Sequence, residues 1–428
     1  MADAIAPPPA GLGVRLGYGV GALAFGIGGM TLSAAVLQLY FNQVIGLPAV
    51  WVGTALMISI LADAAIDPLV GRWSDNLRSP LGRRHTLMYA SAVPAALGFF
   101  LMWHAPAGLK PVGLFAFMVG MLLFVRIASS FFEIPSLALA PELAPDYDER
   151  TRLLAWRFLF LVVGQALVSA ALYQVFLRQD ATNPLGVLNR QRYADFGVFA
   201  ALVILASILI STIATHSRIR YLHVPAAGRT TLGETFQELR RTLSHRGLAI
   251  LMATNLLINV AGGVTAGLSV YLYIHFWGLT PQSISVILTL GPLSSFLSLW
   301  AAPRLSQRYG KRETVLGFYG AWLITAIIPM SARLLGLVPA NGSPIVLAIL
   351  ILDFFLGVGF AVGCHIVLNS MLSDASEDVA VKTGKRSEGV LFAAYGLVGK
   401  AGGGVGAFVA GLLITLVHFP ENARPGTV

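Results

Sequence analysis

The sequence predicts an all-α polytopic membrane protein, and its composition and segment lengths are the observations that lead to this class. The chain has 428 residues, of which 56% are hydrophobic and only 11% are charged, and its mean hydropathy is +0.75. A soluble domain carries about 25% charged residues. Several apolar segments are longer than the roughly 20 residues that a helix needs to cross a bilayer. We therefore expect a bundle of membrane-spanning helices.

Hydropathy predicts six spans, a polar basic stretch and then five further spans. The six spans define an amino-terminal half over residues 1–216, and the five spans define a carboxy-terminal half over 247–428. The stretch between them, residues 217–246, contains TTLGETFQELRR, which reads as a surface helix with a threonine N-cap. The expected spans are 16–41, 48–73, 85–105, 111–141, 152–177, 196–216, 247–276, 282–303, 313–335, 344–372 and 388–417.

The distribution of basic residues predicts the orientation of the chain. Of 29 Lys and Arg residues, 20 fall in the amino-terminal tail and the loops on its side of the membrane, and 6 fall on the opposite side. Basic loops stay in the cytoplasm. We therefore expect the amino terminus and residues 217–246 to be cytoplasmic, in the inner or plasma membrane of the cell. The net charge of +9 reflects these loops and does not indicate a nucleic-acid partner.

The two halves resemble each other in sequence. GLPAVWVGTALM, which begins at Gly46, matches GLTPQSISVILT at Gly278, and LGRRHTLMYA matches YGKRETVLGF around Gly82 and Gly310. Parallel repeats of six helices are typical of major facilitator transporters. This pattern predicts two pseudo-symmetric six-helix halves, and the last helix of the second half is the one missing from the eleven predicted spans.

Two acids lie on one face of the second predicted span. Asp63 and Asp67 are four residues apart, so both carboxylates leave the helix on the same side, about one turn apart. A carboxylate inside a bilayer costs roughly 2.5–3.5 kcal/mol on insertion scales. This double cost predicts a site for a proton or a hard cation such as Na⁺, for which carboxylate oxygens are suitable ligands. The alternative is that the acids neutralise a buried Arg or Lys.

Other charges lie inside predicted spans. Glu133 precedes a helix with two prolines, and we expect it to face the transport cavity, although a link to Arg126 two turns earlier is an alternative. Arg157 either faces the cavity or extends to the cytoplasm as a helix-end cation. Lys400 is too deep to reach either surface, and we expect it to act as a counter-charge for the acid pair. The role of Asp353 stays open.

The loop GRWSDNLRSPLGRR and its counterpart PRLSQRYGKR predict cytoplasmic latches. Asp75 has two candidate roles, pairing with Arg83 or capping a helix N-terminus. Together with Arg84, these residues form the predicted cytoplasmic gate. A solvated basic loop that only sets topology is the alternative.

These motifs resemble those of one transporter family along nearly the whole chain. The resemblance rests on DAAIDPLVGRWSDNLRSPLGRR, EIPSLALAPELAPDYDERT, AWRFLFLVVG, SMLSDASEDVAVKTGKRSEG and YGLVGKAGG. They are similar to the signatures of the glycoside–pentoside–hexuronide:cation symporters, the family of melibiose permease. The resemblance implies a major facilitator fold and coupled transport of a solute with Na⁺ or H⁺.

The resemblance also implies roles for individual residues. Asp63 and Asp67 match the paired acids of the cation site. Glu133 matches an acidic sugar-binding position, Arg157 matches a cavity arginine, and Lys400 matches a lysine near the cation site, so these three are the expected substrate-binding residues.

One departure from the family pattern concerns the first span. Melibiose permease carries there an aspartate that holds the sugar, whereas YGVGALAFGIGG places Phe25 and Gly26 at the corresponding positions. This departure keeps a second substrate class open, since the related lysophospholipid symporters also lack that acid. A sugar or glycoside is the first choice.

Other classes of protein fit the sequence less well. The chain has one cysteine and no HExxH or GxSxG motif, which argues against an enzyme. A non-transporting sensor or scaffold has no reason to keep buried charges. We expect a monomeric symporter in a lipid bilayer that needs a coupling ion but no cofactor.

Overall fold

The computed structural model describes residues 11–144, 146–181, 183, 186–221, 246–383, 388–420 and 423. In this part of the chain, eleven helices are long and apolar enough to cross a membrane. Each overlaps one of the predicted spans, which confirms the predicted all-α membrane fold. The surface helix predicted within residues 217–246 lies largely in 222–245, outside the described residues.

The chain divides into two compact units. The amino-terminal unit comprises Met1–Gly228 and Ala407–Ala423, and the carboxy-terminal unit comprises Arg229–Gly406 and Arg424–Val428. The division predicted from hydropathy instead placed all of residues 247–428 in one half.

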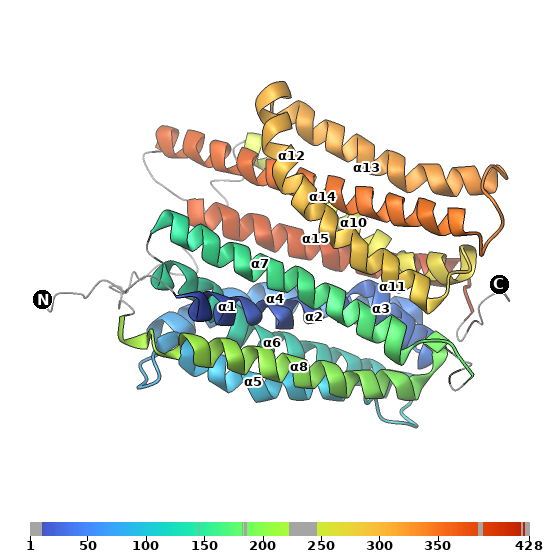
Figure 1. Cartoon of the computed structure of the whole chain (residues 1–428), viewed down its shortest axis with the longest axis horizontal. Helices are drawn as coiled ribbons and strands as arrows, with labels where there is room; N and C mark the ends of the chain where they lie inside the picture. Colours follow the sequence, from blue (N-terminus) through green and yellow to red (C-terminus); the bar gives the residue numbers. More distant parts are fainter. Residues whose placement is uncertain are drawn as a thin grey trace, which may run out of the picture. The chain divides into compact units, whose positions relative to one another are not determined.

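In the amino-terminal unit, α5 and α8 lie side by side, and α5 and α4 both pack on α6 (Figure 1). Its helices are α1 (Leu12–Val20), α2 (Ala22–Thr31), α3 (Ala34–Leu37), the π-helix η1 (Gln38–Val44), α4 (Ala49–Asn76), α5 (Arg83–Met102), α6 (Pro111–Leu143), α7 (Tyr147–Ala170), the π-helix η2 (Ala171–Phe176), η3 (Gly186–Leu188), α8 (Arg190–His216) and η4 (Ile219–Tyr221).

The carboxy-terminal unit is built around α14, against which α10, α11, α12 and α13 pack. Its helices are α10 (Arg246–Tyr271), the π-helix η5 (Leu272–Phe276), α11 (Pro281–Leu290), η6 (Gly291–Leu293), α12 (Ser294–Tyr309), α13 (Lys311–Leu334), α14 (Pro344–Thr383) and the first part of α15 (Glu388–Leu416).

The end of α15 belongs to the amino-terminal unit because glycines allow it to approach α4 closely. A Cβ atom on Gly53 would lie 2.7 Å from the carbonyl oxygen of Ala407, and one on Gly411 would lie 2.4 Å from that of Ala49. Neither position has room for a side chain. Gln43 adds hydrogen bonds to Pro420 and Ala423 beyond the helix end. Small residues are the usual means by which membrane helices come into close contact.

The first predicted span is interrupted in the structure. It was expected to be one helix over residues 16–41, but α2 ends at Thr31 and α3 begins at Ala34. The segment before the break is AFGIGG, and each glycine costs a helix up to about 1 kcal/mol relative to alanine. The Ser33 hydroxyl bonds the Met30 carbonyl at 2.6 Å and so satisfies one of the carbonyls that the break releases.

The internal repeat is visible in backbone geometry. Gly46 and Gly278 follow π-helices at the ends of the first helix of each half, with φ of 88° and 60°. Gly82 and Gly310 precede the third helix of each half, with φ of 77° and 88°. Only glycine adopts these left-handed values at low cost. The matched sequence segments therefore encode matched turns.

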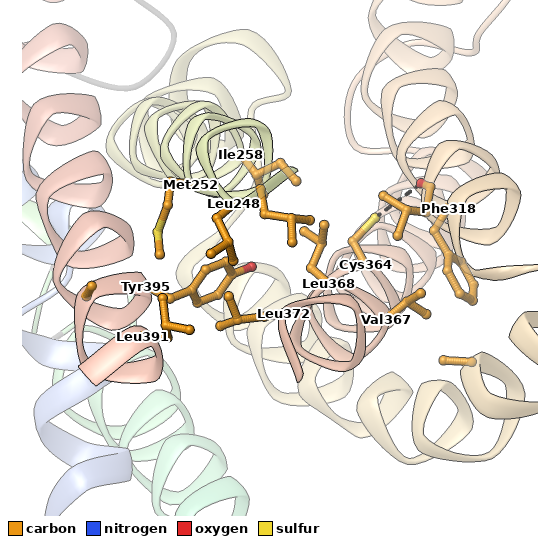
Figure 2. Close-up of a cluster of buried hydrophobic side chains, with 14 residues drawn as sticks. Leu248, Met252, Ile258, Phe318, Cys364, Val367, Leu368, Leu372, Leu391 and Tyr395 are labelled. Atoms are coloured by element: carbon orange, nitrogen blue, oxygen red, sulfur yellow. Dashed lines mark hydrogen bonds between the residues drawn. The ribbon is translucent and has the colours of Figure 1, made fainter. Parts of the chain in front are cut away.

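An apolar core holds the carboxy-terminal unit together (Figure 2). Leu372 and Leu391 are fully buried in this core, and Tyr395 is nearly so. Cys364 is also fully buried, and its thiol lies 3.7 Å from the carbonyl oxygen of Val315. The lone cysteine thus has a packing role in this core.

Candidate functional site: an acid pair facing a serine and an arginine

Asp63 and Asp67 converge on a hydroxyl group from a neighbouring helix. The Ser130 hydroxyl of α6 lies 2.7 Å from Oδ1 of Asp67 and 3.3 Å from Oδ1 of Asp63. The four-residue spacing on α4 puts both acids on the face that packs against α6. Three side-chain oxygens from two helices therefore meet at one point.

These oxygens form a donor set suited to a small hard cation. Ser130 is 2% exposed and has one hydroxyl proton, so it donates to one carboxylate at a time and keeps lone pairs for another partner. Pro68 lies inside α4 and has no N–H, so the Ala64 carbonyl loses its ordinary helical donor. That carbonyl lies in the turn between the two acids. Carboxylate, hydroxyl and carbonyl oxygens are the ligand types that Na⁺-like cations use.

Arg126 completes the cluster. Its Nη1 lies 3.7 Å from Oδ2 of Asp63, and its Nε donates to the Ser59 hydroxyl at 3.1 Å. The side chains of Arg126 and Asp63 are 19% and 13% exposed. A buried arginine therefore lies beside Asp63, as the alternative reading of the acid pair expects. The charge of Arg126 also interacts with Glu133, its predicted alternative partner.

Glu133 lies on α6 one turn after Ser130, and its side chain is exposed in the structure. The backbone carbonyl of Glu133 accepts a hydrogen bond from the Ser136 hydroxyl at 3.0 Å. Pro135 lies inside the same helix and interrupts its hydrogen-bond ladder here. The assignment of Glu133 to substrate binding stays a prediction.

Arg157 is buried in an aromatic pocket and does not extend to the membrane surface. It is 9% exposed, and its Nη1 donates to the Ser136 hydroxyl at 3.0 Å. Its guanidinium lies 4.8 Å from the ring centroid of Phe25 and 5.7 Å from that of Tyr18, within cation–π range. The predicted alternative of a helix-end cation does not fit this burial.

Phe25 and Gly26 occupy the place at which the resemblance leads one to expect an acid. The Phe25 ring stacks on Phe132 at 5.6 Å and covers the guanidinium of Arg157. A Cβ on Gly26 would lie 2.2 Å from the Leu161 carbonyl oxygen, so this position admits no side chain. An aromatic face therefore lies against Arg157 at the position where the sequence resemblance predicts a carboxylate.

The predicted gate residues form an ion cluster with Glu142, which was not among the predicted residues; all but the exposed Asp75 are buried or nearly so. Oε1 of Glu142, at the end of α6, lies 2.7 Å from Nη2 of Arg83 and 2.7 Å from Nε of Arg84. Asp75 is 3.0 Å from Arg84, so it pairs with this arginine and not with Arg83. Glu142 was not predicted as a gate residue because the fourth span was expected to end at residue 141.

The carboxy-terminal unit repeats this pairing at its surface. Lys311 follows Gly310 as Arg83 follows Gly82, and its Nζ lies 2.5 Å from Oδ2 of Asp374 in α14. Their side chains are 33% and 61% exposed, whereas those of Arg83 and Glu142 are 10% and 13% exposed. The repeat therefore keeps the pairing between its third and fourth helices but buries only one copy.

This difference in burial predicts unequal effects of two matched substitutions. Glu142→Gln leaves the buried guanidinium of Arg83 without its acid and leaves Arg84 with only the half-exposed Asp75, which costs about 3–5 kcal/mol. Asp374→Asn breaks an exposed pair, which is worth about 0–1 kcal/mol. Thermal unfolding of the purified protein in detergent checks this: we expect a clearly lower melting temperature for Glu142→Gln alone. Equal losses would contradict the assignment.

Lys400 and Asp353 belong to the carboxy-terminal unit. Gly399, Gly402 and Gly406 beside Lys400 pack on α10, and a Cβ on Gly406 would lie 2.3 Å from the Val260 carbonyl oxygen. The glycine-rich sequence thus brings the two helices together. Asp63 and Asp67 are part of the other unit, so their predicted pairing with Lys400 stays a prediction, and the role of Asp353 stays open.

Comparisons with known proteins agree with this fold. The sequence profile described as MFS/sugar transport protein matches residues 17–428. An uncharacterised symporter of Synechocystis is 26% identical over 93% of this chain and 85% of its own length. The putative glycoside/cation symporter YagG of Escherichia coli is 23% identical over 96% and 84%. A variant of the nucleoside transporter NupG has the same fold, with a TM-score of 0.66 at 14% identity over 95% of this chain and 91% of its own.

The fold and these relatives define a multi-pass membrane transporter and not an enzyme. The chain belongs to the MFS/sugar transport protein family. The resemblance to glycoside–cation symporters found in the sequence motifs is thereby confirmed.

Proposed function

We propose that this protein is a symporter that uses a Na⁺ or H⁺ gradient to move a sugar or glycoside by alternating access. The observation that carries the proposal is the convergence of Asp63, Asp67 and Ser130, which gives an oxygen-rich site inside an apolar helix pair. A carboxylate pair is costly in a membrane unless a cation uses it. The relative described as a putative glycoside/cation symporter supports both the coupling and the solute class.

The distribution of charge supports the proposed orientation in the membrane. The protein lies in the inner or plasma membrane with its amino terminus in the cytoplasm, because its basic loops are on that side. It works as a monomer and needs no cofactor besides the coupling ion. Protease accessibility of an amino-terminal tag in right-side-out and inside-out vesicles tests the orientation, and cleavage only in inside-out vesicles is expected.

Uptake by the purified protein in vesicles tests the function. We expect accumulation of at least one member of a panel of radiolabelled sugars and glycosides when a Na⁺ or H⁺ gradient is imposed, and collapse of accumulation when the gradient is removed. Absence of gradient-driven uptake for the whole panel would contradict the proposal.

A second substrate class, a lysophospholipid or similar amphiphile, is favoured by the aromatic cover of Arg157. Phe25 and Phe132 stack at the position where a sugar-binding acid is expected, and an aromatic surface suits an apolar chain beside a charged headgroup. Stabilisation of the purified protein against heat by lysolipids, with none by the sugar panel, would replace the first substrate class with the second.

Glu133 gives a sharper test of the sugar class. If its carboxylate binds hydroxyl groups of the solute, Glu133→Ala loses a charge-assisted hydrogen bond worth about 1.5–3 kcal/mol. Substrate affinity should then fall on the order of 10- to 100-fold. Glu133→Asp, which keeps the carboxylate, is the matched control and should keep measurable binding. Unchanged affinity in Glu133→Ala, measured by titration calorimetry, would remove Glu133 from the substrate site.

A further inference from the structure

Arg126 is held beside the acid pair by two contacts. Its Nη1 is 3.7 Å from Asp63, and its Nε donates to Ser59 at 3.1 Å. The Ser59 hydroxyl donates to the Leu56 carbonyl at 2.8 Å, so its oxygen lone pairs point away from its own helix and can accept from Arg126. Ser59 is fully buried. The position of the guanidinium is therefore built into the packing of α4 on α6.

The same face of α6 carries both the guanidinium and the third oxygen of the candidate ion site. Arg126 and Ser130 are four residues apart, as are Asp63 and Asp67 on α4. Each acid has its own contact: Asp67 has the shorter bond to Ser130, and Asp63 has the arginine. The guanidinium thus lies nearest Asp63 in a site that has two carboxylates, and its charge also acts on Asp67.

We propose that Arg126 is a tethered competitor of the coupling ion. In the empty site its guanidinium neutralises Asp63, and an entering ion has to displace it or share that carboxylate with it. Because the guanidinium is covalently attached, its effective concentration at Asp63 is constant, and it weakens ion binding in every transport cycle. The inference rests on the proposed function and adds a residue that sets the ion affinity.

This role predicts that removal of the charge tightens ion binding. Arg126→Gln keeps a donor for Ser59 but removes the positive charge beside Asp63. Purified full-length protein is titrated with NaCl and with LiCl at constant ionic strength, balanced with choline chloride, and binding is followed by calorimetry. We expect at least about a tenfold tighter dissociation constant for one of these ions in Arg126→Gln than in the parent, since one unit charge is removed at short range. Arg126→Lys, which keeps the charge, should resemble the parent.

Two further variants keep the test decisive. Arg192→Gln removes one positive charge from the same unit at the start of α8 and should leave ion affinity unchanged. Ser59→Ala removes only the anchor of the guanidinium and should tighten binding by a smaller factor, which covers the case in which Arg126→Gln fails to fold. Equal or weaker binding by Arg126→Gln and Ser59→Ala, or no measurable binding by any protein, would overturn the proposal.

The ion titration is independent of the transported solute. If the parent shows no gradient-driven uptake of the solute panel while Arg126→Gln binds the ion more tightly, the proposed function fails and the role of Arg126 stands. If the parent shows coupled uptake and the ion affinities are equal, the proposed function stands and the role of Arg126 fails.

Discussion

Asp63→Asn and Asp67→Asn are each expected to abolish gradient-driven uptake while leaving membrane insertion intact. Asparagine has nearly the same shape as aspartate, so helix packing is kept and the charge is lost. A unit charge about 4 Å from a monovalent cation contributes about 4 kcal/mol at an effective dielectric constant of about 20. This corresponds to on the order of 1,000-fold in ion affinity.

Ser130→Ala provides a graded comparison for the two acids. It removes one neutral oxygen donor from the same point and leaves both charges in place. We expect the ion affinity measured from uptake to fall roughly 10- to 100-fold, because one hydrogen bond to a charged group is worth about 1.5–3 kcal/mol. Full ion-stimulated uptake in either Asn variant, measured in vesicles with matched protein content, would contradict the cation-site assignment.

Lys400→Ala is expected to separate exchange from accumulation. Four acids lie well inside spans, at Asp63, Asp67, Glu133 and Asp353, and three bases, at Arg126, Arg157 and Lys400, neutralise all but one of these charges. Removal of the Lys400 ammonium makes the net charge of the membrane-spanning part of the protein more negative by one. The coupling ion is then held more strongly throughout the cycle, and return of the empty transporter becomes slow. Loaded transporter still moves in both directions.

The measurement compares two modes of transport in the same vesicles. Lys400→Ala should keep exchange of internal for external solute and lose accumulation against a gradient. Lys110→Ala removes an exposed lysine between two spans and should behave like the parent in both assays. Normal accumulation by Lys400→Ala would show that this ammonium has no part in coupling.

The membrane spans were predictable because the physical signal for them is strong. Twenty consecutive apolar residues have few alternatives to a membrane helix, and prolines and glycines near Gly46, Gly82 and Gly310 ended the helices close to where the turns occur. The acid pair was predictable for a similar reason, since a charge in such a segment is costly and therefore stands out.

The partners of the acids were not predictable from the sequence. Ser59 and Ser130 are neutral residues that a membrane helix tolerates at low cost, so they leave no hydropathy signal. Their importance comes from the rotation of α4 against α6, which is a property of packing. Arg126 did give a signal as a buried charge, but its spacing from Glu133 suggested only a partner on its own helix. In the structure its guanidinium lies 3.7 Å from Asp63 on the neighbouring helix and also interacts with the charge of Glu133.

The first span and the gate show how helix boundaries limit such predictions. Helix α6 runs through Leu143, two residues beyond the predicted end, and this places Glu142 where it contacts Arg83 and Arg84. Hydropathy falls where charges begin, but a helix continues as long as its backbone hydrogen bonds are made. The break at Ser33 could not be predicted from hydropathy, because the glycines before it lie among apolar residues and do not lower the mean hydropathy of the segment enough to end the span.

The most direct test of the central claim is a measurement of ion and solute fluxes together. Solute is added outside vesicles that contain the parent protein, so that its gradient runs inward, and uptake of the coupling ion, 22Na⁺ or H⁺, is recorded. Coupling through Asp63, Asp67 and Ser130 predicts a solute-driven ion flux in the parent and none in Asp67→Asn. A solute-driven ion flux of parental size in Asp67→Asn would contradict it.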